Sequence, residues 1–227
     1  MKTLKEKSYW RNSIFFNNFF INQVQKNRRK FLQTFRKYID YNKNSVVLDV
    51  GATPSLDSHE NFFVQKYPFK KNLTCLSNFN CEILKSKFSE INLALEDARN
   101  MNLKSNKYDI VHSNATIEHV GSFDDQLKFL QECIRVSNKY IFITTPNRFF
   151  PIELHTKLPF LHFLPKTIFR KILILFNDQF FSKEENLNLL SLNDVKKLLK
   201  KSNVKNFKIY KNKVCYLVSN FIIIITK

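Results

Sequence analysis

The chain has 227 residues, of which 37 are Lys or Arg and 19 are Asp or Glu, so its formal net charge is +18. The apolar fraction of 44% is ordinary for a globular protein, and the length predicts one domain over residues 1–227. No apolar segment near the start resembles a signal peptide, and the longest purely apolar run, 221–225, is too short to span a bilayer. These features argue against a secreted or membrane-spanning protein.

The basic charge has two interpretations. A partner rich in phosphate, either nucleic acid or an anionic membrane, would suit it. A drifted composition also explains it, because Lys, Asn, Ile and Phe are abundant along the whole chain while Gly and Ala are scarce. We favour the second interpretation, since the lysines are spread out rather than gathered in one block.

The four cysteines indicate a reducing compartment. No two of them have the C-x-x-C spacing, which argues against a disulfide framework and against a zinc site. We therefore expect a cytoplasmic protein without a bound metal. The cysteines are Cys75, Cys81, Cys133 and Cys215.

The chain begins with a helical arm, residues 1–44, in which apolar residues recur at helical spacing over 8–40. A short β-branched run, 46–50, then predicts a buried strand that ends at Gly51, one of only two glycines. Such a glycine suggests a backbone with positive φ or a close approach to a ligand. Thr53, Ser55 and Asp57 are candidate N-caps for a following helix.

Strands and helices alternate from there to residue 146, which predicts βαβ units and a parallel sheet in an α/β fold. A polar loop, 96–106, interrupts the alternation. The expected strands are 73–77, 91–95, 108–112 and 139–145, and the expected helices are 58–66, 79–87 and 123–136.

Residues 147–190 break this rhythm and predict an inserted, lid-like segment with a helix at 166–176. It contains several prolines and many phenylalanines, and its apolar face could be core, line a substrate pocket or contact a membrane surface. After it come a helix at 194–201 and two closing strands, 204–210 and 216–226. A turn at 211–213 would make these strands an antiparallel pair.

Four stretches in this order resemble the class I S-adenosylmethionine-dependent methyltransferases, particularly the type 11 methyltransferase-domain group. They are V-V-L-D-V-G-A-T-P (46–54), L-E-D-A-R-N-M-N-L (95–103), Y-D-I-V-H-S-N-A-T-I-E-H-V (108–120) and Y-I-F-I-T-T-P-N-R-F-F-P-I-E-L-H-T (140–156). The resemblance implies a Rossmann-like, seven-stranded, mostly parallel sheet with helices on both faces and a closing antiparallel strand. It also implies a methyltransferase that uses S-adenosylmethionine.

The resemblance implies a cofactor site along the ends of the first four strands. Asp49 would meet the ammonium group of the cofactor, Asp97 would accept from the adenine amino group, and the Ala98 backbone would meet the ring. Ser77 or Asn78 would replace the carboxylate that the family usually has at the end of the second strand. The full set is Asp49, Gly51, Ala52, Ser77, Asn78, Asp97, Ala98, His112 and Asn114.

Methyl transfer mainly requires positioning of the acceptor, and a base only where the acceptor must lose a proton. His119 is the first candidate base, with Glu118 beside it to orient the substrate. His155, next to Glu153, is the second. For each histidine a purely structural role is an equal alternative.

Three functions follow from these residues. The first is a methyltransferase whose acceptor is a small molecule, a sugar or a lipid-type intermediate, with peripheral membrane contact as a variant. The second is an inactive scaffold, suggested by the missing strand-two carboxylate. The third, an RNA methyltransferase, is disfavoured because no RNA-binding appendage is recognisable, so we expect no nucleic-acid partner. The sequence does not indicate an oligomeric state.

Overall fold

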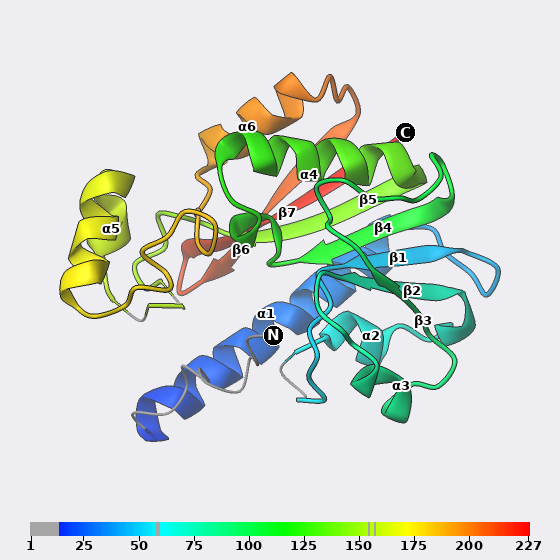
Figure 1. Ribbon diagram of the computed structural model, residues 1–227, viewed down its shortest axis with the longest axis horizontal. Coiled ribbons are helices and arrows are strands. Elements are labelled where there is room, and N and C mark those ends of the chain that lie inside the picture. Colours follow the sequence, from blue (N-terminus) through cyan, green and yellow to red (C-terminus); the bar gives the residue numbers. More distant parts are fainter. Residues whose placement is uncertain (1–13, 58–59, 154, 157) are drawn as a thin grey trace.

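The computed structural model describes residues 14–57, 60–153, 155–156 and 158–227 (Figure 1). Its centre is a seven-stranded sheet with the strand order β3-β2-β1-β4-β5-β7-β6. All neighbouring pairs from β3 to β5 are parallel, whereas β7 is antiparallel to both β5 and β6. The strands are β1 (Val47–Val50), β2 (Leu73–Ser77), β3 (Asn92–Leu95), β4 (Tyr108–Asn114), β5 (Ser137–Pro146), β6 (Phe207–Val214) and β7 (Leu217–Thr226).

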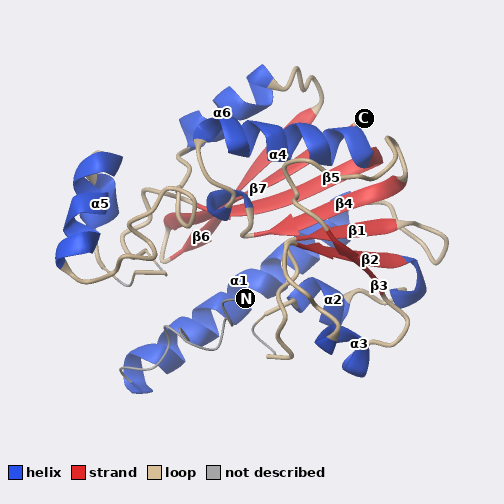
Figure 2. Ribbon diagram, in the orientation of Figure 1, coloured by secondary structure: helices blue, strands red, loops and turns tan. Residues whose placement is uncertain are grey.

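Helices cover both faces of this sheet (Figure 2). On one face lie α4 (Phe123–Val136) and α6 (Leu192–Lys201), and on the other lie α1 (Ile14–Tyr38), α2 (Phe62–Lys66) and α3 (Ile83–Lys87). The α5 helix (Lys166–Leu175) lies away from the sheet. Short 3₁₀ turns occur at η2 (Lys70–Asn72), η3 (Ile117–His119) and η4 (Leu161–Phe163).

Each face of the sheet has its own apolar core. Phe129, Leu130 and Cys133 of α4 pack with Leu198 and Leu199 of α6 on one side. On the other side, α1 and α2 bury their aromatic residues against Ile110 and Phe142 of the central strands; these are Phe31, Phe35, Phe62 and Phe63. The central strands are buried on both faces, which is why their sequences are continuous apolar runs rather than alternating ones.

The strand order reverses between β1 and β4. From β1 the chain proceeds outward through β2 to β3, and it then returns to place β4 on the other side of β1. In open α/β sheets, ligands bind beyond the carboxyl ends of the strands at such a reversal, because the connecting loops separate there. The fold therefore directs attention to residues 49–54 and 112–116.

The predicted fold is confirmed, and β2 and α4 have the predicted bounds. Part of the expected helix 8–40 and of the helix 58–66 falls on residues 8–13 and 58–59, outside the described residues.

Two local predictions were wrong. The α2 helix begins after Asn61, a residue with positive φ, so the candidate caps Thr53, Ser55 and Asp57 do not cap it. The turn between the closing strands is not at 211–213: β6 continues to Val214, and Cys215 and Tyr216 form the turn, both with positive φ.

The segment 147–190, here called the insert, leaves the sheet after β5. Asn147 pairs with Leu190 in an isolated parallel bridge, and the Arg148 N–H donates to the Leu190 carbonyl at 2.9 Å. The two ends of the insert are therefore held together. Between them, α5 packs on a small separate cluster of buried residues, namely Phe169, Leu173, Phe181, Leu187 and Leu189.

Candidate active site

A pocket of about 160 Å³ opens at the reversal between β1 and β4. Its floor is the end of β1 with Gly51, and its walls come from β4, the loop before α2 and the α1 helix. The volume is below the roughly 300–1,000 Å³ of common ligand sites, so the pocket accommodates one end of a larger ligand. Its polar lining residues include Arg28, Asp49, Thr53, Glu60, Asn61, His112 and Asn114.

The backbone conformation at position 51 and the packing of a neighbouring side chain both require glycine. The φ of Gly51 is +96°, and a Cβ atom at this position would lie 2.1 Å from Oγ1 of Thr116. The backbone N–H groups of Gly51 and Ala52 both donate to the Leu76 carbonyl, at 2.9 and 3.0 Å. The glycine thus lets the segment after β4 pack closely onto the β1 turn, while the two amides stabilise the turn rather than face the pocket.

Arg28 of α1 brings a cation into the pocket. Its Nη1 atom is buried and has no hydrogen-bond partner among the described residues, and its guanidinium lies 5.6 Å from the centre of the Phe62 ring. Burial lowers the pKa of Arg28 to about 10, although Glu60 and Asp57 oppose this shift, so the group is cationic at neutral pH. A buried, unpaired guanidinium N–H is costly unless an anion or another acceptor binds it.

Asp49 and His112 form a buried pair at the floor of the pocket. His112 Nδ1 lies 2.6 Å from Asp49 Oδ1, and the imidazole stacks on Phe63 with ring centroids 3.7 Å apart. The pair fixes the direction of the Asp49 carboxylate. Asn114, at the end of β4, accepts a hydrogen bond from Thr144 at 2.7 Å and also lines the pocket.

The residues predicted for the purine side do not line this pocket. Ser77 is buried at the end of β2 and its hydroxyl accepts from the Phe79 N–H at 3.1 Å, whereas Asn78 is exposed. The Asp97 carboxylate is bound on both oxygens by the Arg99 guanidinium, which lowers the pKa of Asp97. Ala98 is buried in the core beside it.

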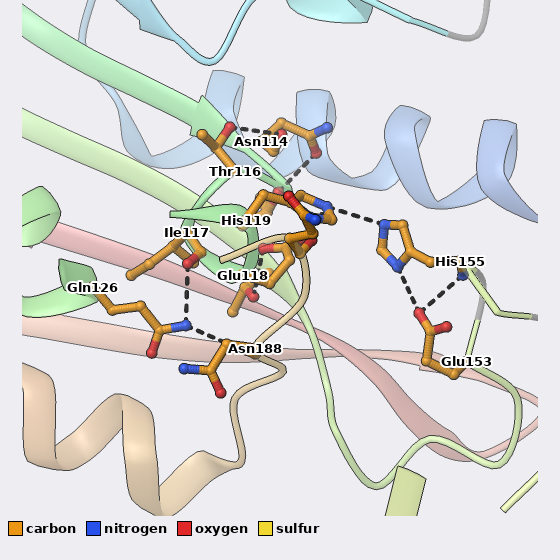
Figure 3. A network of polar contacts seen from close by, with 12 residues as sticks. Asn114, Thr116, Ile117, Glu118, His119, Gln126, Glu153, His155 and Asn188 are labelled. Atoms are coloured by element: carbon orange, nitrogen blue, oxygen red, sulfur yellow. Dashed lines mark hydrogen bonds and ion pairs between the residues drawn. The ribbon is translucent and has the colours of Figure 1, made fainter. Parts of the chain in front are cut away.

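The two candidate bases, predicted as alternatives, lie together (Figure 3). His119 Nε2 and His155 Nε2 are 3.1 Å apart. His119 Nδ1 lies 2.6 Å from the Asn186 carbonyl, and His155 Nδ1 lies 2.5 Å from Glu153 Oε1. The η3 turn after β4 therefore meets the insert at this cluster.

The pKa values of the two imidazoles are shifted in opposite directions. Burial and, to a smaller extent, the neighbouring His155 lower the pKa of His119 to about 4. Burial also acts to lower the pKa of His155, but the Glu153 carboxylate outweighs it and the pKa is raised. Glu153, which accepts from the backbone N–H groups of His155 and Thr156, has a pKa of about 2 despite its burial.

Glu118 is fully buried beside the histidines. Its Oε2 accepts from the Thr145 hydroxyl at 3.0 Å, but its Oε1 has no hydrogen-bond partner among the described residues and lies 4.0 Å from His119 Nε2. Burial raises the pKa of Glu118 to about 7. Gln126 and Asn188 hold its backbone in place, because Gln126 Nε2 donates to the Ile117 carbonyl and the Asn188 N–H donates to the Glu118 carbonyl.

Sequence reasoning missed Arg28 and underrated Glu153. Arg28 lies among many basic residues of the helical arm, and only the packing of α1 distinguishes it from Arg29, which is exposed. The E-L-H spacing at 153–155 was a usable signal for a carboxylate that orients a histidine. Among the described helices, none is long and apolar enough to cross a membrane.

Comparison with known proteins bears on the fold and on the middle of the chain. A family model described as "Methyltransferase domain" matches residues 69–140. No curated protein matches the chain.

Three solved structures illustrate the similarity. A SAM-dependent methyltransferase from Methanosarcina mazei is 12% identical with a TM-score of 0.55, covering 82% of this chain and 94% of that one. One from Archaeoglobus fulgidus is 16% identical with a TM-score of 0.53, covering 95% and 100%. A possible histamine N-methyltransferase from Thermotoga maritima is 17% identical with a TM-score of 0.53, covering 92% and 98%.

The strand order, the antiparallel β7 and these structures define the class I methyltransferase fold. The match of residues 69–140 to the methyltransferase-domain model agrees with the family resemblance seen in the sequence.

Proposed function

We propose that this chain transfers a methyl group from S-adenosylmethionine to a small-molecule, sugar or lipid-type acceptor. The observation that carries the proposal is the pocket at the β1/β4 reversal, which presents a buried guanidinium with an unpaired N–H, from Arg28, and a carboxylate, from Asp49. This charge pair is complementary to the zwitterionic amino-acid end of the cofactor. The residues present thus fit the cofactor that the fold family uses.

The chain's own part in the chemistry is to bind and orient. S-adenosylmethionine supplies an activated methyl group, so no protein nucleophile is required. Arg28 would hold the carboxylate of the amino-acid end and Asp49, fixed by His112, would hold the ammonium group. The exposed Asn78 and the core residue Ala98 then remain candidates for the ribose and purine.

The acceptor would bind where η3 meets the insert. Glu118 and His119 come from the segment after β4, which also supplies Asn114 and Ala115 to the pocket. Glu153 and His155 come from the insert. The cluster lies next to the pocket along the chain and carries polar groups that could orient an acceptor. A pKa of about 4 makes His119 a weak proton acceptor at neutral pH, which disfavours its predicted role as a simple base.

Replacing Arg28 tests the cofactor site. The change Arg28→Met removes the charge but keeps an apolar side chain beside Phe62, and we expect the affinity for S-adenosylmethionine to fall by about 10–100-fold, as for a lost charged hydrogen bond. Isothermal titration calorimetry with the cofactor and with S-adenosylhomocysteine measures this.

Arg29→Met is the matched control, because Arg29 is exposed one residue further along the same helix. It should bind the cofactor as the unmodified chain does. Absence of detectable binding by the unmodified chain at millimolar cofactor would favour the inactive scaffold. Unchanged affinity in Arg28→Met would remove Arg28 from the site while leaving the proposed activity in place.

A further inference from the structure

The His119–His155 contact poses a problem of electrostatics. The Asn186 carbonyl can only accept, so His119 Nδ1 carries its proton, and a neutral ring then has a bare lone pair on Nε2. The Glu153 carboxylate, which already accepts from the backbone N–H groups of His155 and Thr156, likewise accepts from His155 Nδ1. Two bare nitrogen atoms would therefore face each other at 3.1 Å, which is repulsive unless a cation lies between them.

A proton shared by the two rings would remove this repulsion but would leave Glu118 unexplained. Its Oε1 is buried, unpartnered among the described residues and 4.0 Å from His119 Nε2. Glu118, His119 and His155 each offer one ligand atom, and all three atoms lie within 4.8 Å of one another. A metal ion would satisfy all three, whereas a proton satisfies only the histidines.

The distances suit a transition metal. At the tetrahedral angle, metal bonds of about 2.0–2.2 Å to histidine nitrogen and carboxylate oxygen place neighbouring ligand atoms roughly 3.3–3.6 Å apart. The two Nε2 atoms, 3.1 Å apart, need to separate slightly. Glu118 Oε1 lies 4.0 Å from His119 Nε2, and all three ligand atoms lie within 4.8 Å of one another, so Glu118 needs to approach by roughly 0.5–1.5 Å.

The outer contacts are also those of a metal site. Histidine ligands are usually oriented by a carboxylate or a backbone carbonyl on the second ring nitrogen. Glu153 orients His155 in this way (Figure 3), and the Asn186 carbonyl orients His119. The Thr145 hydroxyl plays the same part for Glu118.

We propose that Glu118, His119 and His155 bind a divalent transition-metal ion, with Zn²⁺ as the first candidate. Two imidazoles and one carboxylate are a donor set for such ions, and three protein ligands leave a coordination position open. The next step rests on the proposed function. The open coordination position binds an oxygen atom of the methyl acceptor, so the acceptor is an alcohol or a phenol. The sequence-based expectation of no metal considered only cysteine spacing.

Metal titration tests the site without any acceptor. The full chain, stripped with a chelator, is titrated with Zn²⁺ by calorimetry and with Co²⁺ by its visible absorption. We expect one equivalent of ion to bind, and a loss of affinity beyond about 100-fold in His119→Ala, His155→Ala and Glu118→Gln. The variant Glu153→Gln, which alters only the orienting carboxylate, should lose about 10–100-fold.

His162→Gln is the control, because His162 is a buried histidine of the insert that hydrogen-bonds to the Phe150 carbonyl and to none of the three proposed ligands. It should bind metal normally. The proposal would be overturned if the unmodified chain failed to bind Zn²⁺, Co²⁺ or Mn²⁺ below millimolar concentration. It would also be overturned if His119→Ala and His155→Ala bound the metal as tightly as the unmodified chain does. Circular dichroism checks that each variant is folded.

Cofactor calorimetry on the stripped chain separates this proposal from the proposed function. S-adenosylmethionine binding without metal binding refutes the metal site alone. Metal binding without cofactor binding refutes the methyl transfer and leaves the metal site in place.

Discussion

Single residues at the β1/β4 reversal stabilise the fold and also determine the shape of the pocket. Gly51 allows Thr116 to lie against the β1 turn, and the Thr116 hydroxyl in turn donates to the Val50 carbonyl at 3.2 Å. The same turn carries Asp49 on one side and continues to Asn61 on the other. Asn61 holds the long loop closed, since its amide bonds both the N–H and the carbonyl of Thr53.

We expect Gly51→Ala to destabilise the fold by about 2–4 kcal/mol, from the positive φ and from the contact with Thr116. Thr116→Ala alone should cost about 1 kcal/mol, as for one lost hydrogen bond. Because Thr116→Ala also removes the closest clashing atoms, the double variant should be more stable than the sum predicts by at least about 1 kcal/mol. Urea denaturation measures all three variants; strict additivity would mean that Thr116 does not restrict this position.

At the scale of elements, the β6–β7 hairpin combines a protected edge with a strained turn. β6 is an edge strand, and its exposed residues include Lys208, Lys211 and Lys213. Lysines on an edge strand discourage pairing with other chains. They also explain the wrong turn prediction, because K-N-K resembles a polar turn in sequence although Asn212 is buried and donates to Asn27 and Ser219.

The true turn offers a stabilising change. Cys215 and Tyr216 have φ values of 47° and 66°, the pattern of a type I′ turn, which Asn-Gly prefers. Since the Tyr216 side chain is 96% exposed, the pair Cys215→Asn with Tyr216→Gly removes strain at little cost in contacts. We expect a gain of about 1 kcal/mol, a rise in Tm of roughly 2–4 °C for a chain of this size.

Thermal unfolding followed by circular dichroism measures this gain. Tyr216→Ala is the control, since it trims the same side chain but keeps the strained backbone, and its Tm should not rise. A gain of equal size in the control would mean that the tyrosine, and not the positive φ, destabilises the turn.

At the scale of the whole molecule, the insert and the sheet have separate cores. Among the described residues of the insert, five buried apolar side chains form its own cluster, and many of its other apolar side chains are exposed, such as Leu175 and Phe176. The sheet is flanked by two larger clusters. Regions with few buried contacts open at lower free energy than the global fold.

We therefore expect the amides of α5 to exchange with solvent at least about 100-fold faster than those of α4. Both are described helices that carry an apolar face, so α4 is the internal reference. Hydrogen exchange followed by mass spectrometry resolves the two peptides. Equal protection would show that the insert and the sheet unfold as one unit.

The sheet was predictable because its signals are local. Apolar runs, the single glycine after β1 and the serine cap of α4 each mark an element without reference to the rest of the chain. The polar side chains after β4 could be selected as site candidates from the sequence for the same reason. Arg28 and the pairing of His119 with His155 were not, because they depend on how α1 and the insert pack, over separations that no local pattern encodes.

The isolated bridge between Asn147 and Leu190 has a consequence for engineering. The bridge between Asn147 and Leu190 holds the two ends of the insert together. The residues between these ends can therefore be replaced by another segment without changing the distance between the two attachment points. The cost of closing a loop grows only slowly with its length, so donor segments of other sizes are admissible. A graft confined to residues 158–185 would retain Glu153 and His155 on the first stem and Asn186 and Asn188 on the second, so it would change selectivity while the cluster keeps its orienting contacts.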